Sequence, residues 1–182
     1  YTTIKRSALI NFLKKDLKDL IKTGYNISKI DQQNSQIKLY FENNKNIDCD
    51  FLIISDGVFS KSKYLISNNQ IKPKYNDTLA IRGIITKSHV NIDKKNISLF
   101  LGSDFHHVVY PVNSGGDLNF IAIMRYKLST EEQRNYSLFS ENSFIKKVLE
   151  KIPLSSKDFL DDLKELKIFP VFVSENFYKS HN

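Results

Sequence analysis

The sequence predicts a mixed α/β fold of the α+β kind, in which a helix and several strands precede a second, mostly antiparallel sheet with helices. Three observations predict it. A helical pattern of apolar residues occupies 4–22, short apolar strand patterns follow it, and four further strand patterns separated by turn residues lie within 79–125. The chain therefore divides into an N-terminal part and a C-terminal sheet part.

The composition is typical of a folded globular protein. Of the 182 residues, 41% are hydrophobic and 26% are charged, and the formal net charge is +7. The positive charges are scattered and form no dense arginine block, so nucleic acid is not an expected partner. The single cysteine, Cys49, excludes an internal disulfide and a cysteine-rich metal site, and we expect no metal. No apolar run reaches the length of a bilayer and no signal peptide is visible, so we expect a cytoplasmic protein.

The N-terminal part begins with an amphipathic helix. Leu9, Phe12 and Leu13 start a series of apolar residues at spacings of three and four, and Gly24 follows as the glycine that ends a helix. Alternating polar and apolar residues then predict three strands, at 26–30, 36–41 and 47–54. We expect a small meander whose last strand joins a larger sheet.

The end of the third strand is a candidate ligand site. Residues 51–54 are four consecutive apolar residues, which is typical of a strand buried on both faces. Ligands of open α/β sheets bind at the carboxyl ends of such strands, and Asp56 and Gly57 occupy that position. The alternative is that Asp-Gly forms an ordinary tight turn.

The C-terminal part begins after a short polar stretch of serine, asparagine and glutamine at 67–70, which predicts a crossing between domains before Pro73. The strand patterns beyond it lie at 79–87, 97–101, 106–112 and 117–125, with a hairpin turn at 114–116. Helices are predicted at 141–152 and 156–166, and a returning edge strand at 167–174. We expect domains at 1–66 and 67–174, with 175–182 returning toward the first.

Two N-terminal segments carry motifs. Asp56-Gly57 is followed by Ser60 and Lys63, and Arg6 is followed by leucines three and seven residues later. The first is similar to the Asp-Gly fingerprint, with lysine in place of arginine, and the second to the His-Arg element, with lysine in place of histidine, of the FAD-dependent aromatic-ring monooxygenases, the group A flavoprotein hydroxylases with the para-hydroxybenzoate hydroxylase fold. The resemblance implies part of a FAD-binding Rossmann-like domain, with Arg6, Asp56 and Gly57 contacting FAD.

The second sheet resembles the salicylate-hydroxylase-like members of the same family. Gly102, His106 and Tyr110 follow their Gly-x-x-x-His-x-x-x-Tyr-Pro-Val pattern, and Arg82-Gly83 follows their Arg-Gly strand. The resemblance implies that Arg82, His106 and Tyr110 bind an aromatic substrate and that His106 and Tyr110 orient or deprotonate it. His106 and Tyr110 share one face of a strand. The alternative for each is a half-buried strand residue.

The function implied by this resemblance is hydroxylation of a small phenolic or carboxylated aromatic substrate with FAD, NAD(P)H and O₂. The Gly-x-Gly-x-x-Gly and Gly-Asp-Ala fingerprints of the family are absent from the sequence, so we expect an internal fragment that is inactive alone. One alternative is a ubiquinone-biosynthesis-type hydroxylase, and another is a non-catalytic anion- or nucleic-acid-binding domain. The ring substrate, the choice between NADH and NADPH, and the oligomeric state, including a homodimer, stay open.

Overall fold

The computed structural model describes residues 3–33, 36–67, 72–86, 91–93 and 95–174. These residues form two compact units. The sheet unit contains the described residues up to Leu13 and those from Tyr75 to Val171, and the meander unit contains those from Lys14 to Lys74 and from Phe172 onward. The expected domain crossing at 67–70 and the return at 175–182 lie largely or wholly outside the described residues and stay predictions.

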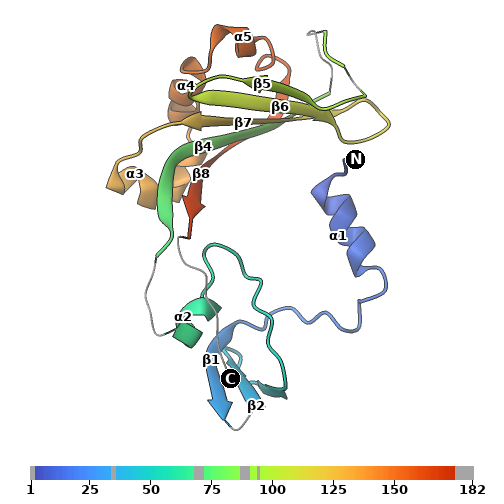
Figure 1. The fold of residues 1–182 in the computed structure, drawn as a ribbon, viewed down its shortest axis with the longest axis vertical. Coiled ribbons are helices and arrows are strands. Elements are labelled where there is room, and N and C mark those ends of the chain that lie inside the picture. The colour runs from blue at the N-terminus through green and yellow to red at the C-terminus, as the bar shows by residue number, and fades with distance from the viewer. Residues whose placement is uncertain (1–2, 34–35, 68–71, 87–90, 94, 175–182) are drawn as a thin grey trace. The chain divides into compact units, whose positions relative to one another are not determined.

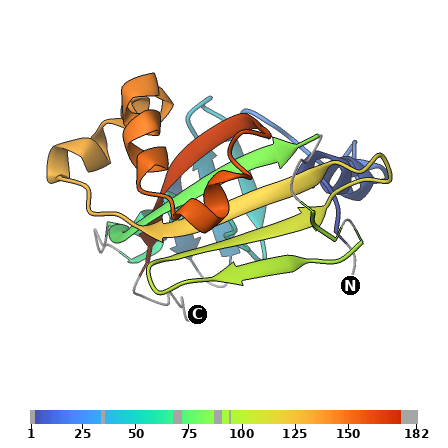
Figure 2. The same ribbon diagram turned by 90° about the horizontal axis from the view of Figure 1, so that it is seen from above.

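The sheet unit is built on five strands in the order β5-β6-β7-β4-β8, seen side by side in Figure 2. Neighbouring strands pair antiparallel from β5 through β6 and β7 to β4. The strands are β4 (Lys74–Ile85), β5 (Ser98–Leu101), β6 (Phe105–Pro111), β7 (Leu118–Arg125) and β8 (Leu163–Val173). The four strands predicted within 79–125 are therefore confirmed, although β4 begins at Lys74.

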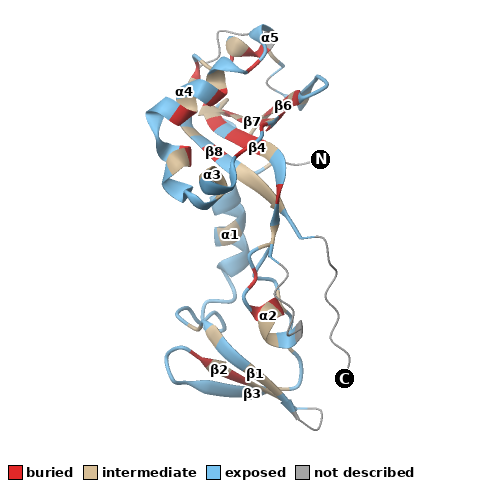
Figure 3. Ribbon diagram, turned by 90° about the vertical axis from the view of Figure 1, so that its left-hand side faces the viewer, coloured by how far each residue is buried: buried red, intermediate tan, exposed pale blue. Residues whose placement is uncertain are grey.

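The two faces of this sheet differ in burial. Alternate residues of β6 and β7 are buried, among them His107 and Phe120, whereas the residues between them are half-buried. The helical segments between β7 and β8 cover the face that carries the buried residues (Figures 1 and 3), where Phe159 contacts His107 and Phe144 contacts Tyr126. We call this the helix-covered face. The core of the unit lies there because burying these aromatic and aliphatic side chains removes the most apolar surface from water.

Four short helical segments follow β7: α3 (Thr130–Arg134), the 3₁₀ helix η1 (Tyr136–Ser140), α4 (Asn142–Glu150) and α5 (Leu154–Lys157). The predicted helix at 141–152 is confirmed as α4. Helix α3 was not predicted, although its capping box is readable in the sequence: the Ser129 hydroxyl accepts from the Glu132 N–H, and the Glu132 carboxylate accepts from the Ser129 N–H.

The prediction of a helix over 156–166 is wrong. Helix α5 ends at Lys157, and from Leu163 the chain is the extended strand β8, which lies beside β4 at the edge of the sheet. Gly83 of β4 permits this close approach, since a Cβ there would lie 2.8 Å from Leu163 Cδ2. Pairing with β4 therefore overrides the local helical pattern.

The meander unit confirms the predicted small antiparallel sheet. Its strands β1 (Ile27–Gln33), β2 (Gln36–Phe41) and β3 (Asn46–Cys49) pair in sequence order, and helix α2 (Ser62–Ser67) follows. The ring of Phe41 packs edge-on against Tyr25, with centroids 5.1 Å apart. The mixed α/β fold class with antiparallel sheets is thus confirmed.

Two N-terminal predictions need correction. Helix α1 (Arg6–Lys14) is shorter than the predicted 4–22 and has no buried residue. Residues 51–54 do not form the predicted buried strand, because they have no regular structure and leave Phe51 and Ile53 86% and 88% exposed. A strand needs a neighbour that pairs with its N–H and C=O groups, and among the described residues no strand pairs with this segment.

Candidate functional site

The register of the sheet places the three predicted substrate residues on one face. Arg82 of β4 pairs with Ile121 of β7, which pairs on its other side with Val108 of β6. Val108 lies between His106 and Tyr110, and directly paired residues point to the same side of a sheet. Arg82, His106 and Tyr110 therefore lie on the face opposite the helical segments that follow β7, which we call the opposite face.

The middle of the opposite face is apolar. Val108 and Ile121 lie between Arg82 and the two β6 side chains, and Ile123 extends the apolar strip along one neighbouring row. In the other neighbouring row, the polar Asn119 lies between Ile84 and Tyr110. From the usual strand spacing, the Cα atom of Arg82 lies roughly 10 Å from that of Val108, and the Cα atoms of His106 and Tyr110 lie about 13 Å apart along β6. Apolar side chains beside a few polar groups have the composition of the lining of a small-molecule site.

The polar groups of this face are not engaged elsewhere. Arg82 is exposed, His106 and Tyr110 are half-buried, and their side chains hydrogen-bond to no residue within the described ranges. They are therefore available to a ligand.

The neighbouring histidine, His107, lies on the helix-covered face. Its ring stacks on Phe100 with centroids 4.2 Å apart, and its Nδ1 lies 3.2 Å from the Ser156 hydroxyl. Burial, with a smaller contribution from His106, lowers the pKa of His107 to about 4, so the imidazole is neutral near pH 7. A cavity of about 550 Å³ lies beside it, and none of the three predicted substrate residues lines that cavity.

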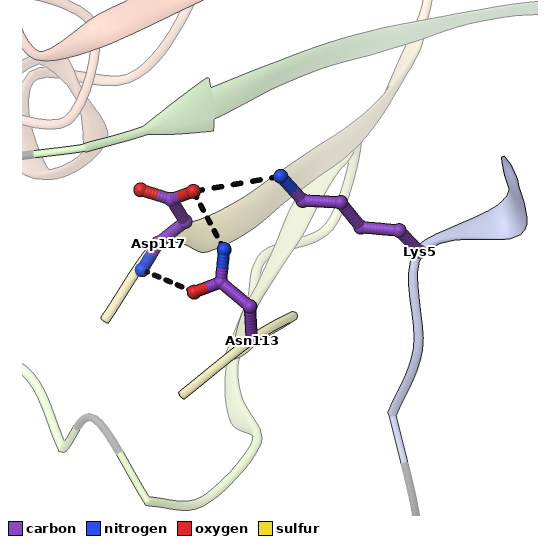
Figure 4. A network of polar contacts seen from close by, with 3 residues as sticks. All are labelled: Lys5, Asn113 and Asp117. Atoms are coloured by element: carbon purple, nitrogen blue, oxygen red, sulfur yellow. Dashed lines mark hydrogen bonds and ion pairs between the residues drawn. The ribbon is translucent and has the colours of Figure 1, made fainter. Parts of the chain in front are cut away.

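Arg6, the predicted cofactor residue of the sheet unit, is the first residue of α1. Its side chain is exposed and pairs with no carboxylate among the described residues. The residues before it contact the β6–β7 hairpin: the Thr3 hydroxyl donates to the Pro111 carbonyl, and Lys5 Nζ lies 3.5 Å from Asp117 Oδ2 (Figure 4). A free guanidinium at a helix N-terminus is suited to a phosphate group.

Asp56 and Gly57, in the meander unit, form a turn that leads into α2. Gly57 has φ 84°, a conformation that favours glycine. Asp56 Oδ2 accepts from the Ser62 N–H at 3.2 Å. Burial opposes ionisation of Asp56, but hydrogen bonds from Ser60 and Ser62 outweigh it and lower its pKa. Asp56 therefore has a structural role at the start of α2, and its predicted contact with FAD, like that of Gly57, stays a prediction.

Among the described residues, no three His, Cys, Asp or Glu side chains are grouped so that they could hold a metal ion. In the same part of the chain, no helix is long and apolar enough to cross a membrane.

Comparison with solved structures shows the fold. HpxO of Klebsiella pneumoniae, complexed with FAD and uric acid, is similar in structure. The match covers 95% of this chain and 44% of the HpxO chain, with a TM-score of 0.73 at 14% identity. A salicylate hydroxylase substrate complex matches 92% and 45% with a TM-score of 0.68 at 17% identity. 2,6-Dihydroxypyridine-3-hydroxylase of Arthrobacter nicotinovorans matches over 89% of this chain and 49% of that enzyme, with a TM-score of 0.67 at 13% identity.

The sequence comparison agrees with the fold. No protein-family model matches the chain. Salicylate hydroxylase of Pseudomonas putida is 25% identical to it over 138 residues, which are 68% of this chain and 32% of that enzyme. The chain is related to the FAD-dependent aromatic hydroxylases. It spans between a third and a half of the length of these hydroxylases, and the resemblance inferred from its motifs is confirmed.

Proposed function

We propose that the protein carrying this chain is a monooxygenase that uses FAD, NAD(P)H and O₂ to hydroxylate a small aromatic substrate with a phenol or carboxylate group. The observation that supports this proposal is the placement of Arg82, His106 and Tyr110 around one apolar strip of the sheet. When bound, FAD supplies the redox chemistry that activates O₂. The protein binds and orients the ring and excludes water.

Each side chain of the opposite face has a role in this proposal. The Arg82 guanidinium pairs with the anionic group of the substrate, for which its planar fork is suited. The ring rests on Val108 and Ile121. A ring nitrogen of His106 accepts the phenol proton, and Tyr110 Oη, four residues further along β6, hydrogen-bonds to another polar group of the substrate and orients the ring. Removing that proton raises the electron density of the ring and makes hydroxylation easier.

The residues proposed to bind FAD come from the family resemblance and from their exposure to solvent. The free guanidinium of Arg6 fits the anionic part of FAD, and the exposed backbone at Gly57, where a Cβ would meet no atom within 4 Å, leaves room for a ligand. Asp56 contacts FAD near its ribose. We expect the chain alone to be inactive, because its sequence has neither glycine-containing fingerprint of the family. We further propose a cytoplasmic location.

The proposal is tested by purifying the protein that contains this chain and recording its visible spectrum. Absorption bands at about 375 and about 450 nm are expected from protein-bound oxidised flavin. NADH and NADPH oxidation is then measured with salicylate and other phenolic acids, with product analysis to separate hydroxylation from wasteful oxygen reduction. A colourless protein that takes up no added FAD would overturn the proposal.

A further inference from the structure

We propose that Thr3, Lys5 and Asp117 form a clamp that fixes the start of α1, and with it Arg6, against the strand that carries Tyr110. These three are positioning residues for FAD, acting through Arg6. The inference rests on the proposed function and adds to it a link, within the sheet unit, between the predicted cofactor side chain and the predicted substrate face.

The contacts of the clamp converge on the β6–β7 hairpin, one at the last residue of β6 and one at the residue just before β7. The Thr3 hydroxyl donates to the carbonyl of Pro111, the residue directly after Tyr110. Lys5 Nζ lies 3.5 Å from Asp117 Oδ2, two residues before Asn119, which pairs with Tyr110 across the strands. Arg6 follows Lys5 directly in the chain, so the two contacts set where α1 begins relative to Tyr110.

The hairpin side of the clamp is already held in place. Asn113 Nδ2 donates to Asp117 Oδ2 at 2.8 Å, and the Asp117 N–H donates to Asn113 Oδ1 at 3.1 Å (Figure 4). The Val112 N–H donates to the Asp117 carbonyl at 3.0 Å. The Asp117 carboxylate is therefore a fixed point, and ordering Lys5 against it reduces the conformational entropy that α1 loses when it binds a ligand.

Helix α1 has few other means of being positioned. No residue of the helix is buried, so apolar packing does not fix its orientation. The contacts of Thr3 and Lys5 are polar and partly exposed, which makes each of them weak. Their effect is on the position of the chain: they hold the residues immediately before Arg6 against the hairpin and leave the Arg6 guanidinium free.

The test asks whether removing a negative charge strengthens or weakens the binding of FAD. Asp117→Asn removes a negative charge, so the electric field alone would make the anionic FAD bind more tightly. The clamp predicts the opposite, a two- to fivefold weaker binding, which is about the size of an exposed ion pair. The substituted asparagine can still accept from Asn113 Nδ2, so the hairpin is retained. FAD affinity is measured by flavin fluorescence on apoprotein of the whole protein.

Asp31→Asn is the matched control. Asp31 pairs with Lys29 in the meander unit and its side chain is 28% exposed, against 27% for Asp117. We expect this variant to bind FAD with unchanged or slightly higher affinity. Thr3→Val, which removes only the hydroxyl donor, should weaken FAD binding as Asp117→Asn does. Lys5→Arg, which keeps the ion pair, should keep the wild-type affinity for FAD.

The outcomes separate the clamp from the proposed function. A wild-type protein that does not bind FAD overturns the proposed function and the clamp with it. Wild-type binding together with equal or tighter binding by a folded Asp117→Asn variant overturns the clamp alone. Thermal unfolding of each apoprotein shows whether a variant is folded. If Asp117→Asn unfolds, Thr3→Val decides: unchanged FAD affinity in that variant overturns the clamp.

Discussion

The buried imidazole of His107 lies 3.2 Å from the Ser156 hydroxyl, and this contact joins strand β6 to helix α5. His107 is surrounded by the rings of Phe100, Phe120 and Phe159. A neutral imidazole suits these surroundings and a charged one does not, since charge is strongly disfavoured among apolar rings. The stability of the sheet unit should therefore depend on pH.

We expect acid to destabilise the protein through His107. Its pKa is lowered from 6.5 to about 4 in the folded state, so the unfolded state binds the proton first as the pH falls. The stabilising contribution is complete above pH 6.5 and is lost as the pH falls toward 4, with a loss of up to about 3 kcal/mol. Urea unfolding at several pH values measures it. His107→Phe should reduce the pH dependence in this range, and an unchanged slope in that variant would contradict the assignment.

Gly83→Ala should destabilise the sheet unit by about 1–3 kcal/mol, the usual cost of overpacking. The added methyl group would lie 2.8 Å from Leu163 Cδ2 and 3.1 Å from the Lys164 carbonyl oxygen, so β8 would have to move away from β4. Gly115→Ala is the control, because its nearest neighbour lies 3.4 Å away, on the exposed Asn113 side chain. Urea unfolding of both variants checks the prediction, which fails if the two lose equal stability.

Substitutions on the opposite face should lower turnover and leave the fold intact. Tyr110→Phe and His106→Asn are each expected to lower kcat about 100-fold, as removal of an acid–base group commonly does. Both side chains are half-buried and unpaired among the described residues, so stability should change little. Tyr136→Phe, at an exposed tyrosine of η1, is the control and should keep full activity. Product formation by the whole protein, with saturating substrate and whichever of NADH and NADPH the wild type oxidises, provides the measurement.

Arg82→Met should affect substrate binding more than turnover. If Arg82 pairs with a carboxylate, its loss raises KM for a carboxylated substrate about 10- to 100-fold and leaves KM for an uncharged phenol nearly unchanged. Steady-state kinetics with one substrate of each kind compares them. An equal rise in KM for both would show that Arg82 does not bind the carboxylate.

Ser129→Ala should cost about 1 kcal/mol, because it removes the hydroxyl that accepts from the Glu132 N–H at the start of α3. Thermal unfolding measures the change. Ser114→Ala, at an exposed serine of the β6–β7 turn, is the control and should leave the melting temperature within the error of wild type. Equal effects of the two substitutions would contradict a capping role.

The sequence by itself determined where β2, β6 and β7 lie. In β2, polar and apolar residues alternate along the strand. In β6 and β7, runs rich in aromatic and β-branched residues lie between turn residues, which is typical of strands, although both faces of β7 carry apolar side chains. The family motifs around Arg6, Asp56 and His106 were equally readable, because a motif is a local property of the chain. The sequence comparison confirmed the relationship that they indicated.

The tertiary structure decided what depends on partners distant in sequence. Residues 163–166 have a helical pattern and yet extend as β8, because β4 offers a pairing edge at Gly83. Phe51 and Ile53 have a strand pattern and yet stay exposed, because among the described residues no strand pairs with them. The register of β4, β7 and β6 placed Arg82 on the face of His106 and Tyr110. Register is a relationship between strands, so no single segment of the sequence contains it.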